Sequence, residues 1–271
     1  MFRREFLSAL PVLPALAQGQ SASSTTTSGG PAAAPSFYEW RQYALRTGAS
    51  SRRLDDYLQN ALIPSLNRLG HTPIGVFQVT FGLPTPTYFV LTPSAAGGGV
   101  ESLVAREAKL DADDAYMKAA APYLEAAATD PVYVRQEVSL LSAFPQFPRV
   151  SVPAATSAKG PRMFELRTYE SPSEQGHRKK VKMFAEMGEI DIFKRSGLTP
   201  VFFSRTVAGP RMPSLVYMLV HENMAAREKS WSVFGSDPDW RKLAQTPGFT
   251  DPEIVSNITT VFLRPAAYSQ I

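Results

Sequence analysis

The spacing of apolar residues is easiest to follow in the second half of the chain. Residues 163–170 alternate between apolar and polar, which predicts a strand. Residues 173–196 instead place Val181 and Phe184 near helical spacing opposite a charged face, which predicts a helix that ends before Gly197. The later pattern predicts strands at 200–207 and 214–222, a helix from Asn223 that is interrupted near 235–238, and a last strand at 253–263.

The predicted order of elements, β-α-β-β-α-β, is that of a ferredoxin-like module, an antiparallel sheet with both helices on one face. The first half of the chain fits the same order. Pro64 inside its first helix predicts a kink or an early break, because proline removes a helical hydrogen bond. The strands of this half are expected near 37–46, 73–82, 87–92 and 132–142, and its helices near 52–69 and, in two pieces, 100–128.

Three short segments of the first half recur in the second half, in the same order and at nearly constant separation. Each match alone is weak, but three in register indicate that one module is present twice. The matching pairs are Tyr38–Tyr43 with Phe164–Tyr169, Gly70–Pro73 with Gly197–Pro200, and Ala105–Glu107 with Ala226–Glu228.

Helices on only one face leave the other face of each sheet bare, and a second sheet of the same kind can cover it. We therefore predict an α+β fold in which two tandem ferredoxin-like modules turn their antiparallel sheets toward each other, as a pseudo-dimeric α/β barrel with a cavity between the sheets. One chain then forms a monomer with pseudo-twofold symmetry, and further oligomerisation stays open. The modules are expected at 36–144 and 163–267, joined by a proline-punctuated linker at 145–162.

The first residues resemble a twin-arginine export signal. Arg3 and Arg4 are followed by Phe6 and Leu7, and a short apolar run ends in the small-x-small pattern of residues 15–17. We expect a signal peptide at 1–17, a flexible tether at 18–35, and a protein exported to the periplasm or beyond. The alternatives are a general secretory signal and a basic start that arises by chance. No apolar stretch reaches the length of about 18 residues that a membrane span needs.

Composition limits the kinds of site that the chain can form. Hydrophobic residues make up 44% and charged residues 19%, as in a soluble globular protein, and the absence of cysteine excludes disulfides, thiolate metal sites and cysteine nucleophiles. The net charge of +4 raises the question of nucleic acid, but no nucleic-acid-binding motif accompanies it, so we expect no such partner. The basic clusters at 52–53 and 178–180 are interpreted as solvated helix faces. Three scattered histidines without matching carboxylates predict no metal site.

The main candidate site residues lie on the first strand of each module. Because strand side chains alternate, the apolar set Phe164 and Leu166 is expected to pack on the helices, with the polar set pointing between the sheets. A buried arginine must be paired, and the glutamate two residues away is its natural partner. The pair either fixes the docking of the sheets or forms a polar wall that grips an anionic or carbonyl-bearing ligand. The polar set is Glu165, Arg167 and Tyr169, repeated as Glu39, Arg41 and Tyr43.

Four further residues are candidates for the same ligand site. His221 ends the third strand of the second module and could face the cavity with Tyr217. A single histidine can ligate haem, although a hydrogen-bonded structural histidine is the more common case. Trp231 and Trp240 flank the helix break, where they suit a core or a ligand cage.

The second module resembles the NIPSNAP family over about residues 163–265, and the first module resembles it more weakly over 37–143. The resemblance rests on the Phe164–Tyr169 strand, the Gly197–Pro200 joint, Trp231-x-x-Phe234 and Asp237–Trp240. It implies membership of the dimeric α/β-barrel group, in which haem proteins and cofactor-independent oxygenases occur. The family has no settled biochemical activity, so the resemblance bears on the fold more than on the function.

Three functions remain open, and the first is preferred because no catalytic constellation is evident. A binder of a small, partly apolar ligand requires a cavity between the sheets with Arg41 and Arg167 on its wall. An enzyme, either a cofactor-independent monooxygenase or a haem protein, also requires His221 to point inward. A protein-interaction module requires Trp231 and Trp240 to be exposed together. No cofactor is evident, and haem is the minority alternative.

Overall fold

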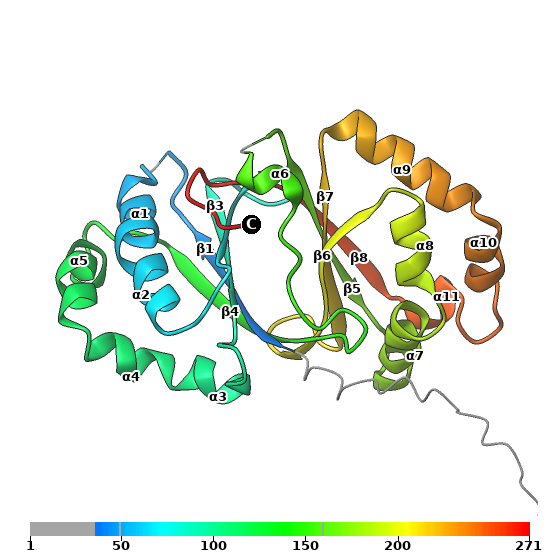
Figure 1. Ribbon diagram of the computed structural model, residues 1–271, viewed down its shortest axis with the longest axis horizontal. Coiled ribbons are helices and arrows are strands. Elements are labelled where there is room, and N and C mark those ends of the chain that lie inside the picture. Colours follow the sequence, from blue (N-terminus) through cyan, green and yellow to red (C-terminus); the bar gives the residue numbers. More distant parts are fainter. Residues whose placement is uncertain (1–35, 49, 159) are drawn as a thin grey trace, which may run out of the picture. The chain divides into compact units, whose positions relative to one another are not determined.

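Eight antiparallel strands close into one barrel in the computed structural model, which describes residues 36–48, 50–158 and 160–271. The order around the barrel is β1-β3-β2-β8-β5-β7-β6-β4 (Figure 1). The strands are β1 Phe37–Ala44, β2 Gly75–Phe81, β3 Thr87–Pro93, β4 Arg135–Ala143, β5 Met163–Glu170, β6 Thr199–Ala208, β7 Ser214–His221 and β8 Asn257–Pro265.

Each half of the barrel is one ferredoxin-like sheet, β4-β1-β3-β2 in the first module and β8-β5-β7-β6 in the second. The edge strands of one sheet pair with the edge strands of the other, β2 with β8 and β4 with β6. Closure therefore removes the exposed edges that each sheet would have alone. The predicted fold class, two such modules joined as a pseudo-dimeric α/β barrel, is confirmed.

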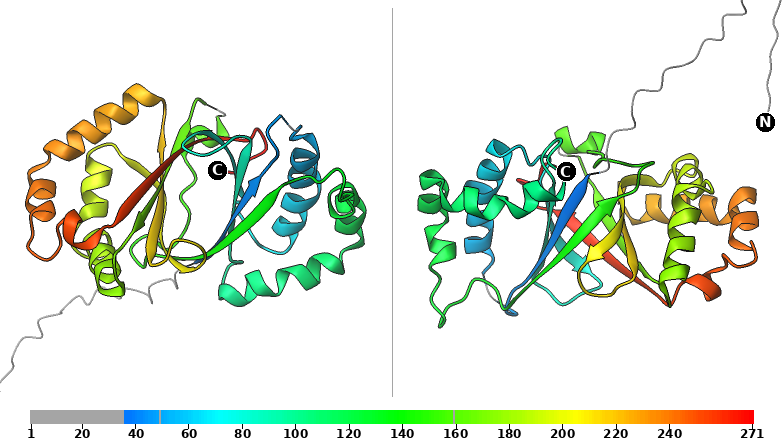
Figure 2. Two further views of the ribbon diagram at one scale, coloured as in Figure 1. Left: turned by 180° about the vertical axis from the view of Figure 1, so that it is seen from behind. Right: turned by 90° about the horizontal axis from the view of Figure 1, so that it is seen from below.

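Helices cover the barrel on two opposite flanks, α1 to α5 on one and α7 to α11 on the other (Figure 2). The helices are α1 Arg52–Tyr57, the π-helix η1 Leu58–Leu62, α2 Ile63–Arg68, α3 Gly99–Val104, α4 Arg106–Asp111, α5 Asp114–Leu124, α6 Ala154–Ser157, α7 Glu174–Ala185, α8 Glu189–Arg195, α9 Met224–Ser236, α10 Pro238–Ala244 and α11 Asp251–Ile254.

The helix expected at 173–196 is divided in two, because Gly188 takes a left-handed conformation with φ of 91°. Its predicted start is confirmed, since Ser173 accepts a hydrogen bond from the backbone of Gly176. Pro64 does not break the first helix. It occupies the first turn of α2, after the π-helical turn, where its missing N–H costs little.

The barrel interior is filled by side chains from both modules. Trp40 stacks on Phe89 with ring centroids 4.9 Å apart, and Phe77 meets Phe164 across the modules at the same distance. Ile271 is also buried in this interior cluster. The sequence predicted a cavity between the sheets, but these side chains fill the middle of the barrel.

The faces of β5 are the reverse of the expected ones. Phe164 and Leu166 point into the barrel, whereas Tyr169 packs with the side chains of the second helical layer. Glu165 likewise meets partners from α9. The reason is that the barrel interior is lined by apolar side chains of all eight strands. Buried charged residues such as Glu165 and Arg167 need partners of opposite charge, and the helices supply them. Arg41 and Arg167 accordingly do not line a cavity between the sheets.

Two expectations concern parts of the chain that the structure does not describe. The signal peptide at 1–17 and the tether at 18–35 both lie outside the described residues. Within the described ranges, no helix combines the length and the apolarity that a membrane crossing requires.

Candidate functional site

A fully buried carboxylate organises the polar residues of β5. Glu165 accepts hydrogen bonds from Arg227 Nε and Nη2 at 2.9 and 2.8 Å and from Trp231 Nε1 at 2.9 Å, and His221 Nε2 lies 3.2 Å away. Burial alone would raise the pKa of Glu165, but these neighbours and Arg167 lower it to about 2. Glu165 is therefore an ionised acceptor that holds α9 on the sheet.

Most of the residues predicted for the second module lie around this carboxylate. The guanidinium of Arg167 lies 4.7 Å from the ring centroid of Trp231 and 5.3 Å from that of Tyr169. Tyr217 donates a hydrogen bond to the hydroxyl of Tyr169 at 3.4 Å. Trp240 is set apart and packs on Phe234 with centroids 4.4 Å apart. These residues therefore lie together, but on the helix side of the sheet and not between the sheets.

The first module repeats the central ion pair. Glu39 accepts from Arg41 Nε at 2.9 Å and from Arg106 Nη2 at 2.7 Å. Burial raises the pKa of Glu39, and the two guanidinium groups more than offset this, so the pKa is lowered. Tyr43 packs against tyrosine rings, Tyr123 and Tyr133. Because both modules bond a strand glutamate to a helix arginine, this pair is best explained as a structural link between strand and helix.

A second buried charge cluster was missed from the sequence. Lys180 is 1% exposed, and its Nζ lies 3.1 Å from Asp251 and 3.7 Å from Glu189. Burial raises the pKa of Glu189 to about 7, an effect that Lys180 opposes and Asp251 reinforces. The interpretation of residues 178–180 as a solvated face is wrong for Lys180. Its spacing of four from Phe184 placed it on the buried side of α7, and that spacing was the available signal.

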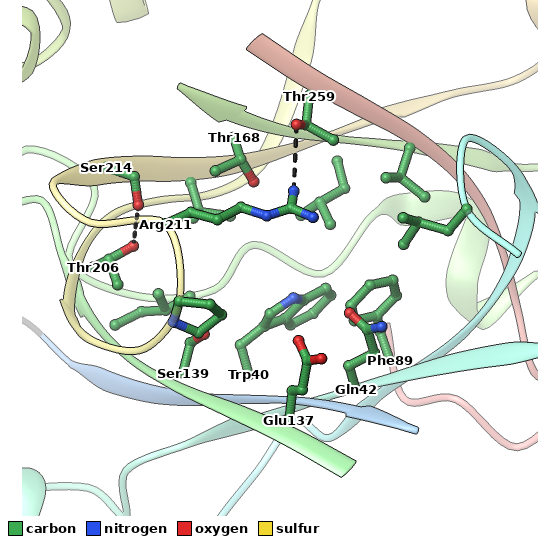
Figure 3. A pocket seen from close by; sticks show the side chains of 16 residues that line it. Trp40, Gln42, Phe89, Glu137, Ser139, Thr168, Thr206, Arg211, Ser214 and Thr259 are labelled. Carbon is green, nitrogen blue, oxygen red and sulfur yellow. Dashed lines mark hydrogen bonds between the residues drawn. The ribbon is translucent and has the colours of Figure 1, made fainter. Parts of the chain in front are cut away.

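A pocket of about 80 Å³ opens at one end of the barrel, between the two modules. It lies where β1, β5 and β6 end and where β4, β7 and β8 begin, and we call it the mouth pocket (Figure 3). One wall comes from the first module and carries Trp40, Gln42, Phe89 and Glu137.

The opposite wall of the mouth pocket has different chemistry at equivalent positions. Trp40 lies opposite Ser139 in the β1–β4 pair, and Leu166 lies opposite Val261 in the β5–β8 pair. Trp40 and Leu166 therefore occupy equivalent positions in the two modules. By the same register, Gln42 corresponds to Thr168, Phe89 to Val216, and Glu137 to Thr259. An aromatic and acidic wall therefore faces an aliphatic and hydroxyl-bearing wall.

Arg211 lies across the mouth pocket, with Thr168 and Thr259 on one side and Trp40 and Glu137 on the other (Figure 3). Its Nη1 donates to Thr259 Oγ1 at 3.3 Å. Arg211 is the non-glycine residue of the described chain with a positive φ, 63°, a conformation that costs about 1 to 2 kcal/mol for a residue with a Cβ. Such strain is often found at ligand clamps.

Neither haem nor a metal ion fits these groups. His221 is buried against Glu165 on the helix side of the sheet, and a pocket of about 80 Å³ cannot hold a macrocycle. Among the described residues, no group of three or more histidine, aspartate or glutamate side chains is placed to hold a metal ion. The mouth pocket instead suits a small ligand.

Comparison with known proteins agrees with the fold. Residues 164–270 match the NIPSNAP family model. A candidate monooxygenase from Lactobacillus acidophilus NCFM is 10% identical with a TM-score of 0.55, over 85% of this chain and 94% of its own. A candidate monooxygenase from Fusobacterium nucleatum subsp. nucleatum ATCC 25586 is 6% identical with a TM-score of 0.52, over 86% and 93%.

A third solved structure, of an anthrone oxidase-like protein, is 6% identical with a TM-score of 0.50, over 88% of this chain and 95% of its own. At these identities the likeness establishes a shared fold. No curated protein matches the chain.

Proposed function

Residues 164–270 are a NIPSNAP domain, and from this premise we propose that the chain is an exported binding protein whose small, partly apolar ligand is held between the two sheets, in the mouth pocket. The observation that carries the proposal is Arg211, an arginine kept in a left-handed conformation over that pocket. A fold tolerates such strain where a side chain must be aimed.

The difference between the two walls supports the same proposal. The Glu–Arg link on the helix side is repeated in both modules, as a structural feature should be. The mouth pocket lies on the other side of the same strands, yet its equivalent positions have diverged to Trp40 and Leu166, and to Glu137 and Thr259. Different side chains at equivalent positions give the two walls different chemistry, which is the pattern expected of a specialised site.

An enzyme is the second candidate, and Glu189 is the observation that favours it. A carboxyl group with a pKa of about 7, beside Lys180, can accept or donate a proton near neutral pH. A cofactor-independent monooxygenase of the kind suggested by the shared fold could use such a group. The interaction module is disfavoured, because Trp231 bonds Glu165 and Trp240 packs on Phe234 instead of forming an exposed pair.

The test of the binding proposal is Arg211→Gly. Glycine adopts the same φ without strain, so the variant should fold with equal or greater stability while losing the ligand. Native mass spectrometry of protein purified from its own host measures the retained ligand, and Arg178→Ala, at an exposed position, is the matched control. Retention of the ligand by Arg211→Gly, or the same loss in both variants, would contradict the proposal.

Export is proposed on the first residues alone. Replacing Arg3 and Arg4 by lysine should retain the protein in the cytoplasm if it uses the twin-arginine route, because that route requires the arginine pair. Cell fractionation and the intact mass of the exported form measure the outcome. Export of the double-lysine variant would favour a general secretory route, and an uncleaved cytoplasmic wild type would remove the proposal.

A further inference from the structure

The two walls of the mouth pocket carry opposite charges. Glu137 on β4 belongs to the first-module wall, and Arg211 in the β6–β7 hairpin belongs to the second-module side. In the described part of the chain, no ion pair joins Arg211 to a carboxylate. The pocket therefore presents two charged side chains that are not paired with each other.

The Glu137 end suits an ammonium group. Within the described ranges, the ion-pair partner of Glu137 is Arg135, whose Nη1 is 4.0 Å away and whose side chain is 69% exposed, so the pair is weak. The indole of Trp40 lines the same pocket and is 7% exposed. A carboxylate beside an aromatic ring is a combination that recognises organic cations.

The Arg211 end suits a carboxylate group. Among the residues that the structure describes, Arg211 has one side-chain hydrogen bond, to Thr259 Oγ1 at 3.3 Å, which leaves the other donors of the guanidinium fork available. The hydroxyl of Thr168 lines the same side of the pocket (Figure 3). A guanidinium fork matches the two oxygens of a carboxylate.

A ligand with one charge would be attracted at one end and repelled at the other. An anion would meet Glu137, a cation would meet Arg211, and an uncharged ligand would use neither. Glu137 and Arg211 line the same pocket of about 80 Å³, so one short molecule in it can meet both. We infer that the ligand of the mouth pocket is a small zwitterion, with an ammonium and a carboxylate group separated by a few bonds. This inference rests on the proposed function of the pocket.

The experiment titrates the full exported chain with probes that differ only in charge. Glycine, β-alanine and glycine betaine are the zwitterions, acetate and methylammonium carry one charge, and acetamide carries none. Binding is followed by the indole N–H signal of Trp40, assigned by its loss in Trp40→Phe. At least one zwitterion should bind tenfold or more tightly than every other probe.

Two variants test the contributions of the two ends of the pocket separately. Glu137→Gln should weaken zwitterion binding at least tenfold and leave acetate no weaker, whereas Arg211→Gly should weaken both zwitterion and acetate. Glu125→Gln, an exposed carboxylate outside the pocket, is the matched control. Circular dichroism establishes that each variant is folded.

The outcomes distinguish the two proposals. If acetate, methylammonium or acetamide shifts the Trp40 signal as strongly as the zwitterions, the zwitterion inference is overturned and the binding function of the pocket stands. If no probe of any charge shifts that signal, and Arg211→Gly retains the ligand found by native mass spectrometry, both are overturned.

Discussion

Two buried carboxylates of the second module show what decides the charge of an acid inside this fold. Glu165 and Glu189 are 0% and 2% exposed, so burial penalises the ionised form of both. Glu165 receives hydrogen bonds from Arg227 and Trp231, and its pKa falls to about 2. Glu189 has a lysine at 3.7 Å and an oxygen without a hydrogen-bond partner in the described structure, and its pKa rises to about 7. The hydrogen-bond donors that surround Glu165 account for its lower pKa.

The raised pKa of Glu189 predicts a pH dependence of stability. The charges that act on it are Lys180 from α7, Asp251 from α11 and Arg167 from β5. In the folded state the pKa is about 7, above the unfolded value, so this group stabilises the fold below about pH 4.5 and the contribution is lost as the pH rises through 7. The full effect is on the order of 3 kcal/mol.

Glu189→Gln should therefore remove that slope. Urea unfolding of wild type and variant between pH 4.5 and 8 measures the free energy of unfolding, and the difference between the two proteins isolates Glu189 from the other groups of the protein. The wild type should lose stability relative to the variant as the pH rises. A constant difference across the range would show that Glu189 has an ordinary pKa.

At the scale of elements, the sequence predicted the order of strands and helices well and the facing of the strands poorly. Local signals such as Asn223 at the start of a helix act within a few residues, and this one is confirmed. Alternation along β5 shows that Glu165 and Arg167 share a face, but not which face is turned inward. Both faces of a strand are buried when a barrel is lined inside and helices lie outside, so the direction depends on distant partners such as Arg227.

The closure between modules depends on a glycine at the β2–β8 seam. Gly82 has φ of 104°, and a Cβ there would lie 2.6 Å from the carbonyl oxygen of Thr260. Gly48 has φ of 76° with nothing within 4 Å of its Cβ position. Gly82→Ala should therefore cost both the conformational strain and a clash with backbone, together about 2 to 4 kcal/mol.

Gly48→Ala should cost only the conformational strain, about 1 kcal/mol. Chemical unfolding of the two variants measures both values under the same conditions. Equal losses would mean that the seam adjusts without cost, and that close approach of β2 to β8 is not what requires Gly82.

At the scale of the whole barrel, the two modules share one interior and keep separate helical layers. The interior cluster draws on strands of both modules, whereas each of the two outer clusters is built around the helices of one. The mouth pocket lies in the shared interior, and it is made of residues that diverged between the copies. The sequence predicted this shared space, but its contents depend on how the side chains of two distant segments fill it. That filling reduced the expected cavity to a pocket at one end.

A shared interior also predicts that the two modules unfold together. Separating them would expose Phe77, Phe164 and the unpaired edges of four strands, so neither sheet is expected to persist without the other. The three tryptophans report on this directly, because Trp40 lies in the barrel interior while Trp231 and Trp240 lie under the helices of the second module. In Trp40→Phe, fluorescence follows the second module alone and far-ultraviolet circular dichroism follows both. The two signals should give one denaturant midpoint, whereas a fluorescence midpoint that departs from the dichroism midpoint would mean that the modules are stable independently and that the seams contribute little.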